Sequence, residues 1–225
     1  PASPVCRHPE RAGDLDGDGF ADVVAADATS GAVSLYLGGP TGLNGVAAAS
    51  WVDPEPTGGL FGGSIAAAGD TNDDGYADLI VGASAHATAY VFHGAPRDRL
   101  AGPPAITLRG TPDARGVSSF GQRASDAGDV DGDGFDDIAV GDASFASSIE
   151  GALTAYGRVA IFLGGATRMA PGRTLDGPLG ATPTNGQFGA VLVAAELDGD
   201  GLPDLVIGAP GSNGVIGSRA YVYLD

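Results

Sequence analysis

Short runs of hydrophobic residues, separated by turns rich in glycine, follow one another along the whole chain. The runs have the length of β-strands, which typically hold about five or six residues. They are too short, and too often bounded by glycine, to show the 3.6-residue period of an amphipathic helix. With 39 glycines in 225 residues and 43% hydrophobic residues, this pattern predicts an all-β protein with many turns.

An acidic stretch interrupts the hydrophobic runs at four places, beginning at residues 14, 70, 129 and 196. Each copy has an oxygen-bearing side chain at positions 1, 3, 5 and 9 and glycine at position 6, and then continues into hydrophobic residues. A period of roughly sixty residues, with about four strands per copy, is typical of a β-propeller blade. We therefore predict one β-propeller domain over residues 1–225, made of four blades of about four antiparallel strands. The expected blades are approximately residues 5–56, 57–115, 116–183 and 184–225.

The acidic stretch has the composition of a calcium-binding loop. Alternate side chains at positions 1, 3 and 5 can turn toward one point, where a hard cation takes several oxygen ligands at about 2.3–2.6 Å. Glycine at position 6 permits a sharp bend, position 7 offers its carbonyl oxygen while its side chain packs inward, and position 9 completes the shell. One such turn could bind nothing, but four in register predict about four Ca²⁺ ions, one per blade. The expected ligands are Asp14, Asp16, Asp18, Phe20 and Asp22; Asp70, Asn72, Asp74, Tyr76 and Asp78; Asp129, Asp131, Asp133, Phe135 and Asp137; and Glu196, Asp198, Asp200, Leu202 and Asp204.

Position 12 distinguishes these loops from an EF-hand, which carries a bidentate Glu there. All four copies have an apolar residue at this position and enter a strand: Ala25, Val81, Val140 and Ile207. Calcium is expected rather than magnesium, because Mg²⁺ demands octahedral geometry and resists dehydration. The second loop has Asn72 at position 3 and the fourth begins with Glu196, so either could be the weaker site.

The formal net charge of -17 arises largely in these loops, which hold more than half of the 28 Asp and Glu residues. Four bound Ca²⁺ ions would bring it to about -9. The charge argues against nucleic acid as a partner, and no hydrophobic run approaches the roughly 20 residues needed for membrane insertion. Weak, solvent-facing calcium loops suit the millimolar calcium outside cells, so we expect an extracellular protein, secreted or at the cell surface. The sequence begins at Pro1, as expected for a mature chain or an excised piece, and Cys6 is its only cysteine.

Phe-Gly pairs precede three of the loops, as Phe61-Gly62, Phe120-Gly121 and Phe188-Gly189, and Gly208-Ala209-Pro210 follows the fourth. In this combination the chain resembles the FG-GAP repeats of integrin α-subunit β-propellers and of bacterial integrin-like propellers. The first unit has Val5-Cys6 in place of Phe-Gly, so its inner strand is the least typical. The resemblance implies strands that run from the propeller axis outward, with the calcium loop between the first and second strand. It also implies that ligands bind at the opposite face.

The family's full ring has seven blades, whereas this chain has four, and its fourth unit lacks an obvious outer strand after Leu224. Four arrangements remain open. The chain could be part of a seven-bladed ring, or a closed four-bladed ring in which residues 1–7 supply the missing outer strand. It could also associate with a second copy into an eight-bladed ring, or remain an open arc whose strand edges invite self-association.

The predicted function is a ligand-recognition or adhesion module with structural calcium and an extracellular protein or glycan partner. No enzyme activity is expected, because no catalytic set stands apart from the calcium loops. The alternative is a carbohydrate-binding or accessory propeller of a secreted hydrolase or lyase, and a spacer without a ligand is the third possibility. Candidate ligand contacts are Trp51, Phe145 and Tyr156, each of which could instead serve packing.

Overall fold

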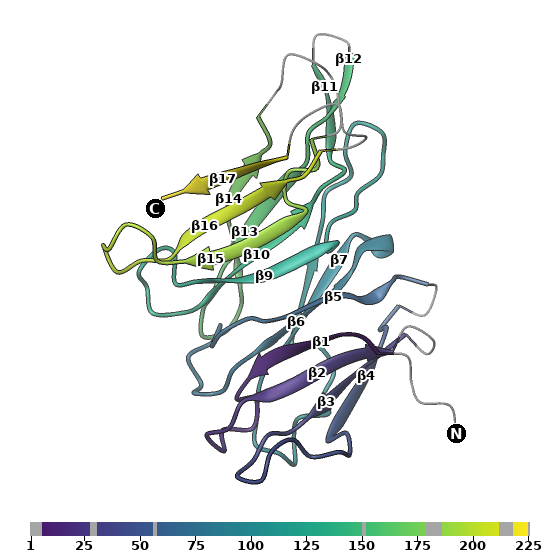
Figure 1. The fold of residues 1–225 in the computed structure, drawn as a ribbon. Coiled ribbons are helices and arrows are strands. Elements are labelled where there is room, and N and C mark those ends of the chain that lie inside the picture. Colours follow the sequence, from purple (N-terminus) through teal and green to yellow (C-terminus); the bar gives the residue numbers. More distant parts are fainter. Residues whose placement is uncertain are drawn as a thin grey trace.

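The computed structural model describes residues 6–27, 31–55, 58–149, 152–178, 186–211 and 218–224. In these ranges the fold is all-β, as predicted, and the one helical element is the short 3₁₀ turn η1 (Ser84–His86). The strands form four antiparallel sheets in series and one additional hairpin (Figure 1).

In each of the four sheets the strands lie in sequence order, from an inner first strand outward. Sheet 1 contains β1 (Cys6–Gly13), β2 (Asp22–Asp27), β3 (Ala32–Tyr36) and β4 (Ala49–Val52). Sheet 2 contains β5 (Phe61–Ala67), β6 (Leu79–Ala83), β7 (Thr88–Phe92) and β8 (Ile106–Arg109). Sheet 3 contains β9 (Arg123–Gly128), β10 (Asp137–Asp142), β13 (Arg158–Leu163) and β14 (Ala170–Asp176). Sheet 4 contains β15 (Val191–Ala195), β16 (Asp204–Ala209) and β17 (Arg219–Tyr223).

The sheets depart from a regular four-stranded repeat at two places. The long connection between β10 and β13 forms a hairpin of its own, β11 (Ala146–Ile149) and β12 (Ala152–Ala155), which the sequence did not predict. Within the described residues, sheet 4 has no fourth strand beyond β17. The edge of β17 therefore carries backbone groups that a further strand could pair.

The hydrophobic core lies between neighbouring sheets, where three clusters of buried residues fill the three interfaces. The Phe of each Phe-Gly pair lies in a different cluster. Phe61, Phe120 and Phe188 are only 7%, 4% and 1% exposed. At the first interface the ring centroid of Phe61 lies 5.9 Å from that of Tyr90 and 6.3 Å from that of Phe92. Aromatic packing of this kind accounts for the Phe of the motif.

The Gly of each pair allows its backbone to approach the preceding sheet. Gly62, Gly121 and Gly189 all have positive φ, at 76°, 85° and 88°. A Cβ atom on Gly121 would overlap the carbonyl oxygen of Thr88 in β7, and one on Gly189 would lie 2.9 Å from that of Arg158 in β13. Only glycine combines this conformation with this proximity.

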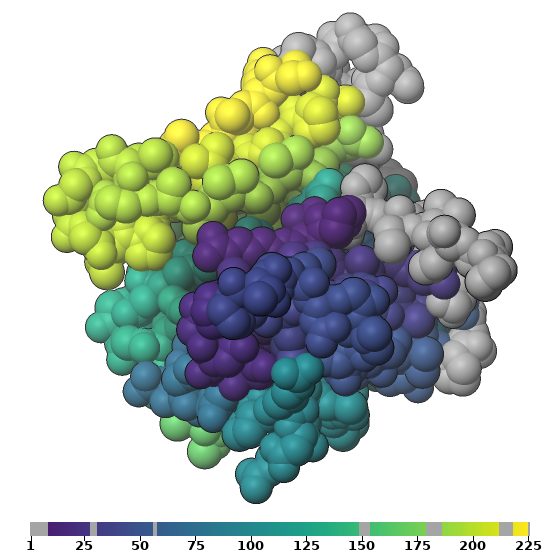
Figure 2. All heavy atoms as spheres, turned by 60° about the horizontal axis from the view of Figure 1, so that its bottom comes forward, coloured from purple at the N-terminus to yellow at the C-terminus, as the bar shows by residue number. Residues whose placement is uncertain are grey.

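The sheets contact one another in series, through the inner-strand pairs β1 with β5, β5 with β9 and β9 with β15. Extensive contact between β15 and β1 does not occur in the described ranges, which show no closed ring. Figure 2 shows the fourth unit, in yellow-green and yellow, as an outer band of the molecule. Val191, Val193 and Val222 of sheet 4 are 48%, 51% and 52% exposed, so this sheet has an apolar face without a neighbouring sheet.

Among the described residues, no helix has the length and hydrophobicity needed to cross a membrane.

Candidate metal centres

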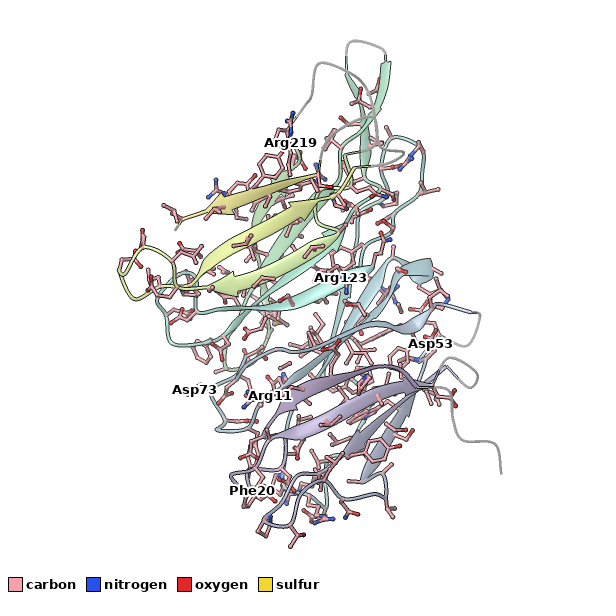
Figure 3. The ribbon with its side chains drawn as sticks, viewed as in Figure 1. Arg11, Phe20, Asp53, Asp73, Arg123 and Arg219 are labelled. Carbon is pink, nitrogen blue, oxygen red and sulfur yellow. The ribbon has the colours of Figure 1, made fainter. Side chains whose placement is uncertain are left out.

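The four acidic loops all connect the first strand of a sheet to its second strand, and they lie along one side of the molecule (Figure 1). Figure 3 labels Phe20 and Asp73 on this side and Asp53 at the opposite end of the sheets. The antiparallel meander brings every loop to the same side, because each sheet begins with a strand of the same direction.

Each loop winds around the carboxylate at position 1. In the first loop, Asp14 Oδ1 accepts hydrogen bonds from the backbone N–H groups of Gly17 and Asp18 at 2.8 and 3.1 Å, and Oδ2 accepts one from Gly19 at 2.8 Å. Gly17 and Gly19 have φ of 74° and 88°, which explains why glycine occupies these turn positions. The second loop has Asp73 at position 4 with φ of 55°, a value that Asp tolerates better than most residues.

The carboxylate at position 9 is buried in every loop, with Asp22, Asp78, Asp137 and Asp204 at most 1% exposed. Its Oδ2 accepts the N–H of position 2 at 2.8–3.0 Å in all four copies. In the first three sheets its Oδ1 accepts the N–H of a glycine that follows the third strand, at 2.8–2.9 Å. The corresponding donor in sheet 4 would be residue 225, which lies outside the described residues. Position 9 therefore fixes the loop to the sheet.

Four carboxyl groups of the loops carry raised pKa values. Burial raises the pKa of Asp22 and Asp78, and it raises the pKa of Asp137 to about 6 against the opposing effect of two backbone N–H donors. Burial also raises the pKa of Asp16, with the charge of Asp18 as the next cause. A cation placed among these groups would favour their ionised forms, so the donor set fits a bound cation.

Three of the loops bring acidic oxygens within 4.8 Å of one another. The groups are Asp14, Asp16 and Asp18; Asp129, Asp131 and Asp137; and Glu196, Asp198 and Asp204. In the second loop the amide of Asn72 stands where the others have a carboxylate. All donors are hard oxygen atoms, which suit Ca²⁺ and do not suit softer metals. The structure thus brings three of the predicted side chains together in each of three loops.

The expectation that the side chain at position 7 packs inward is wrong for the first loop, where Phe20 is 40% exposed. In the second and fourth loops the side chain at position 7 packs on the preceding loop. The ring of Tyr76 lies over Gly17, 2.7 Å from where a Cβ would stand, and Leu202 lies near Gly132 at 3.7 Å. Phe20 is exposed because no described loop precedes its own.

Backbone hydrogen bonds join each loop to the next along the first three sheets. The N–H of Ala77 donates to the carbonyl of Asp14 at 3.0 Å, and that of Asp136 donates to the carbonyl of Asp70 at 3.2 Å. Both donors stand at position 8, between two predicted ligands. The fourth loop has Pro203 at this position, which has no N–H to donate. The series of bonds consequently ends at the third loop.

The three candidate ligand contacts are interior side chains. Trp51 is 6% exposed, its ring lies 5.0 Å from that of Phe92, and its Nε1–H donates to the carbonyl of Gly102 at 3.0 Å. Phe145 and Tyr156 are 6% and 8% exposed, and their ring centroids are 5.9 Å apart. The guanidinium of Arg158 covers the Phe145 ring at 3.6 Å.

A cavity of about 240 Å³, which sequence reasoning did not anticipate, lies between sheets 2 and 3. It is near Asp142, the end of β10 that is remote from the loop. Its lining combines the side chains of Arg109, Phe120, Asp142, Phe145, Arg158 and Phe162, among others. These residues come from separate parts of the chain, so no local pattern indicated them.

Successive antiparallel sheets, each with an oxygen-lined loop between its first and second strand, define a propeller-type repeat protein. Comparison with known families agrees. A model of the FG-GAP repeat matches residues 122–162 and 188–224, and a model of the FG-GAP-like repeat matches residues 14–81. The chain belongs to the FG-GAP repeat family.

The chain is similar to the α-subunits of integrins. It is 34% identical to human integrin alpha-IIb over 71% of its own length and 16% of that protein. It is 31% identical to integrin alpha-V of Gallus gallus over 92% of its own length and 20% of that protein. The chain thus spans a fifth or less of these relatives.

Two solved structures of rhamnogalacturonan lyases share the fold. The lyase YesW superposes with a TM-score of 0.55 at 16% identity, over 89% of this chain and 39% of that one. The lyase of Bacillus licheniformis gives a TM-score of 0.53 at 17% identity, with the same coverage of 89% and 39%. At this identity the likeness concerns the fold alone.

Proposed function

We propose that the chain is a calcium-binding, extracellular β-propeller segment that recognises a protein ligand, as an adhesion or ligand-recognition module without enzyme activity. The observation that carries this proposal is the fourfold recurrence of an oxygen-lined loop in the same place of successive sheets. The similarity to integrin α-subunits supports an extracellular, ligand-binding role. Calcium would neutralise the converging carboxylates of each loop and hold the connection between the first two strands.

Thermal unfolding with and without a chelator tests the structural role of calcium. Binding at one site, with free calcium at 100 times its Kd, stabilises the native state by about 2.7 kcal/mol. EDTA should therefore lower the melting temperature by several degrees, and added calcium should restore it. Magnesium at the same concentration serves as the control and should restore less. A melting curve that EDTA leaves unchanged would contradict the proposal.

The four sheets are further proposed to be blades of a larger ring. The similar proteins extend well beyond this chain, which covers 39% of the lyase chains and 16–20% of the integrins. The apolar outer face of sheet 4 and the free edge of β17 suit an additional blade. Light scattering with and without calcium tests whether a second copy completes the ring. A discrete dimer would support an eight-bladed assembly, and a monomer would exclude it.

The alternative function is carbohydrate binding by an accessory propeller of a secreted hydrolase or lyase. The cavity between sheets 2 and 3 favours it, because Arg109 and Arg158 lie beside aromatic side chains there in a strongly acidic protein. Arg109 pairs with Glu55 and Arg158 with Asp176. A sugar carboxylate would compete for these guanidinium groups, so an acidic sugar is the expected ligand. An array of neutral and uronic-acid oligosaccharides separates the two functions. Selective binding to uronic acids, lost in R109Q, would favour the alternative over a protein ligand.

A further inference from the structure

Two of the positions at which the second unit differs from the other three meet in space. Position 3 of its loop is Asn72, where the other loops have Asp16, Asp131 and Asp198. The residue after the paired core of its third strand is His93, and the equivalent residues in the aligned strands of the other sheets are Leu37, Leu163 and Leu224. Both departures occur in the same unit and nowhere else at these positions.

The two exceptional side chains touch each other. Asn72 Nδ2 lies 3.1 Å from His93 Nδ1 and 3.0 Å from Asp74 Oδ2, while Asn72 Oδ1 accepts the backbone N–H of Asp74 at 3.2 Å. The carboxylate can only accept and the backbone N–H can only donate, so these contacts fix which amide atom is nitrogen. His93 Nδ1 must then be the acceptor, and the imidazole carries its hydrogen on Nε2. That nitrogen is buried without a partner among the described residues.

We propose that His93 is a positioning residue for the second metal site, where it orients Asn72 toward the cation. This inference rests on the proposed calcium function. A carboxylate can present either of two equivalent oxygens, but an amide has one ligand oxygen and an NH₂ group that a cation repels. By accepting a hydrogen bond from Nδ2, His93 prevents the amide from flipping. The oxygen Oδ1, which already accepts the Asp74 N–H, then keeps its second lone pair for the ion. The other loops have Asp at position 3 and need no such partner, which explains the leucine in their sheets.

Single and double variants of the full chain test the assignment by calcium titration calorimetry. H93L should weaken one site of the set by about tenfold or more, as expected when the partner of a metal ligand is lost. The double variant N72D/H93L reproduces the residue pair of the other units and should regain the affinity. The matched control L37H places a histidine at the equivalent position of the first sheet, whose loop has Asp16 at position 3, and should not strengthen any site.

Two results would overturn the inference while leaving the proposed function in place. One is that H93L binds calcium as tightly as the wild type. The other is that N72D and N72D/H93L lose the same calcium affinity relative to the wild type. Absence of calcium binding in the wild-type chain would overturn both.

Nitrogen NMR of the imidazole supplies a readout that does not depend on a variant that folds. His93 should be in the Nε2–H form before and after calcium is added, and its Nδ1 shift should respond to calcium. An Nδ1–H form, or a Nδ1 shift typical of direct metal ligation, would contradict the proposed role.

Discussion

At the scale of single residues, the molecule buries more acidic groups than its proposed metals require. Asp126 on β9 lies outside the predicted ligand sets and accepts the backbone N–H of Gly128 at 2.8 Å. Burial raises the pKa of its carboxyl group, and the charge of Asp136 adds to this, while the Gly128 hydrogen bond acts in the opposite direction. A group with a raised folded-state pKa stabilises the fold when protonated, and this stability is lost as pH rises through the folded pKa.

D126N is therefore expected to be more stable than the wild type at pH 7.5, because the amide is neutral and can still accept the Gly128 hydrogen bond. The advantage should shrink as pH falls and the wild-type carboxyl group becomes protonated. Melting temperatures in EDTA between pH 7.5 and 4.5 measure the effect. D98N changes an exposed carboxylate and should show no such pH dependence. A less stable D126N at pH 7.5 would contradict the argument.

Candidate ligands within the loops could be named from the sequence, whereas the contacts around the loops could not. Positions 1, 3, 5 and 9 could be recognised because their roles depend on spacing within one short stretch. The packing of Tyr76 on Gly17 and the contact of Asn72 with His93 depend on how separate segments meet. Neither contact has a local signal in the sequence. The contact of Asn72 with His93 is indirectly visible there, because both residues differ from their equivalents in the other units.

At the scale of elements, the repeat explains which strands were predictable. Sheets 2, 3 and 4 follow the same order of Phe-Gly, loop and hydrophobic strands, so their first three strands could be assigned from the pattern. The first unit lacks Phe-Gly, and its inner strand was accordingly the least typical. Among the described residues the hairpin β11–β12 occurs in one unit only, and its small and polar residues lack a period. The structure fixes it from outside, through Asp113, whose Oδ2 accepts the N–H of Ala146 at 3.2 Å. Isolated contacts of this kind cannot be inferred from a repeat.

The joint between sheets 2 and 3 gives a prediction at this scale. G121A should destabilise the protein by about 2–4 kcal/mol, because a methyl group would meet the Thr88 carbonyl and alanine disfavours positive φ. Chemical denaturation measures the change.

The matched control for this prediction is G116A, because Gly116 also has a positive φ, of 75°, but has nothing within 4 Å of its Cβ position. It should cost only the conformational strain, roughly 1 kcal/mol. Equal losses in the two variants would mean that close approach of the sheets is unimportant.

At the scale of the whole molecule, each sheet makes its main contacts with its neighbours. A protein of this kind has no single central core, and its stability is close to a sum over units and joints. The same property explains why the sequence left the ring open to four interpretations. Every unit packs against its neighbours through the same two faces. The sequence of one blade therefore does not indicate how many blades precede or follow it.

The proline in the fourth loop has a mechanical consequence for the whole molecule. Backbone hydrogen bonds connect the first three loops, and Pro203 has no N–H with which to connect the fourth loop to the third. On local unfolding, sheet 4 should therefore separate first from sheet 3, between β15 and β9. Hydrogen–deuterium exchange should show that β15–β17 open more often than β9 and β10, and P203A, which restores an N–H, should slow that opening. If P203A leaves the exchange of β15–β17 unchanged, the hydrogen bonds between loops do not determine which sheet opens first.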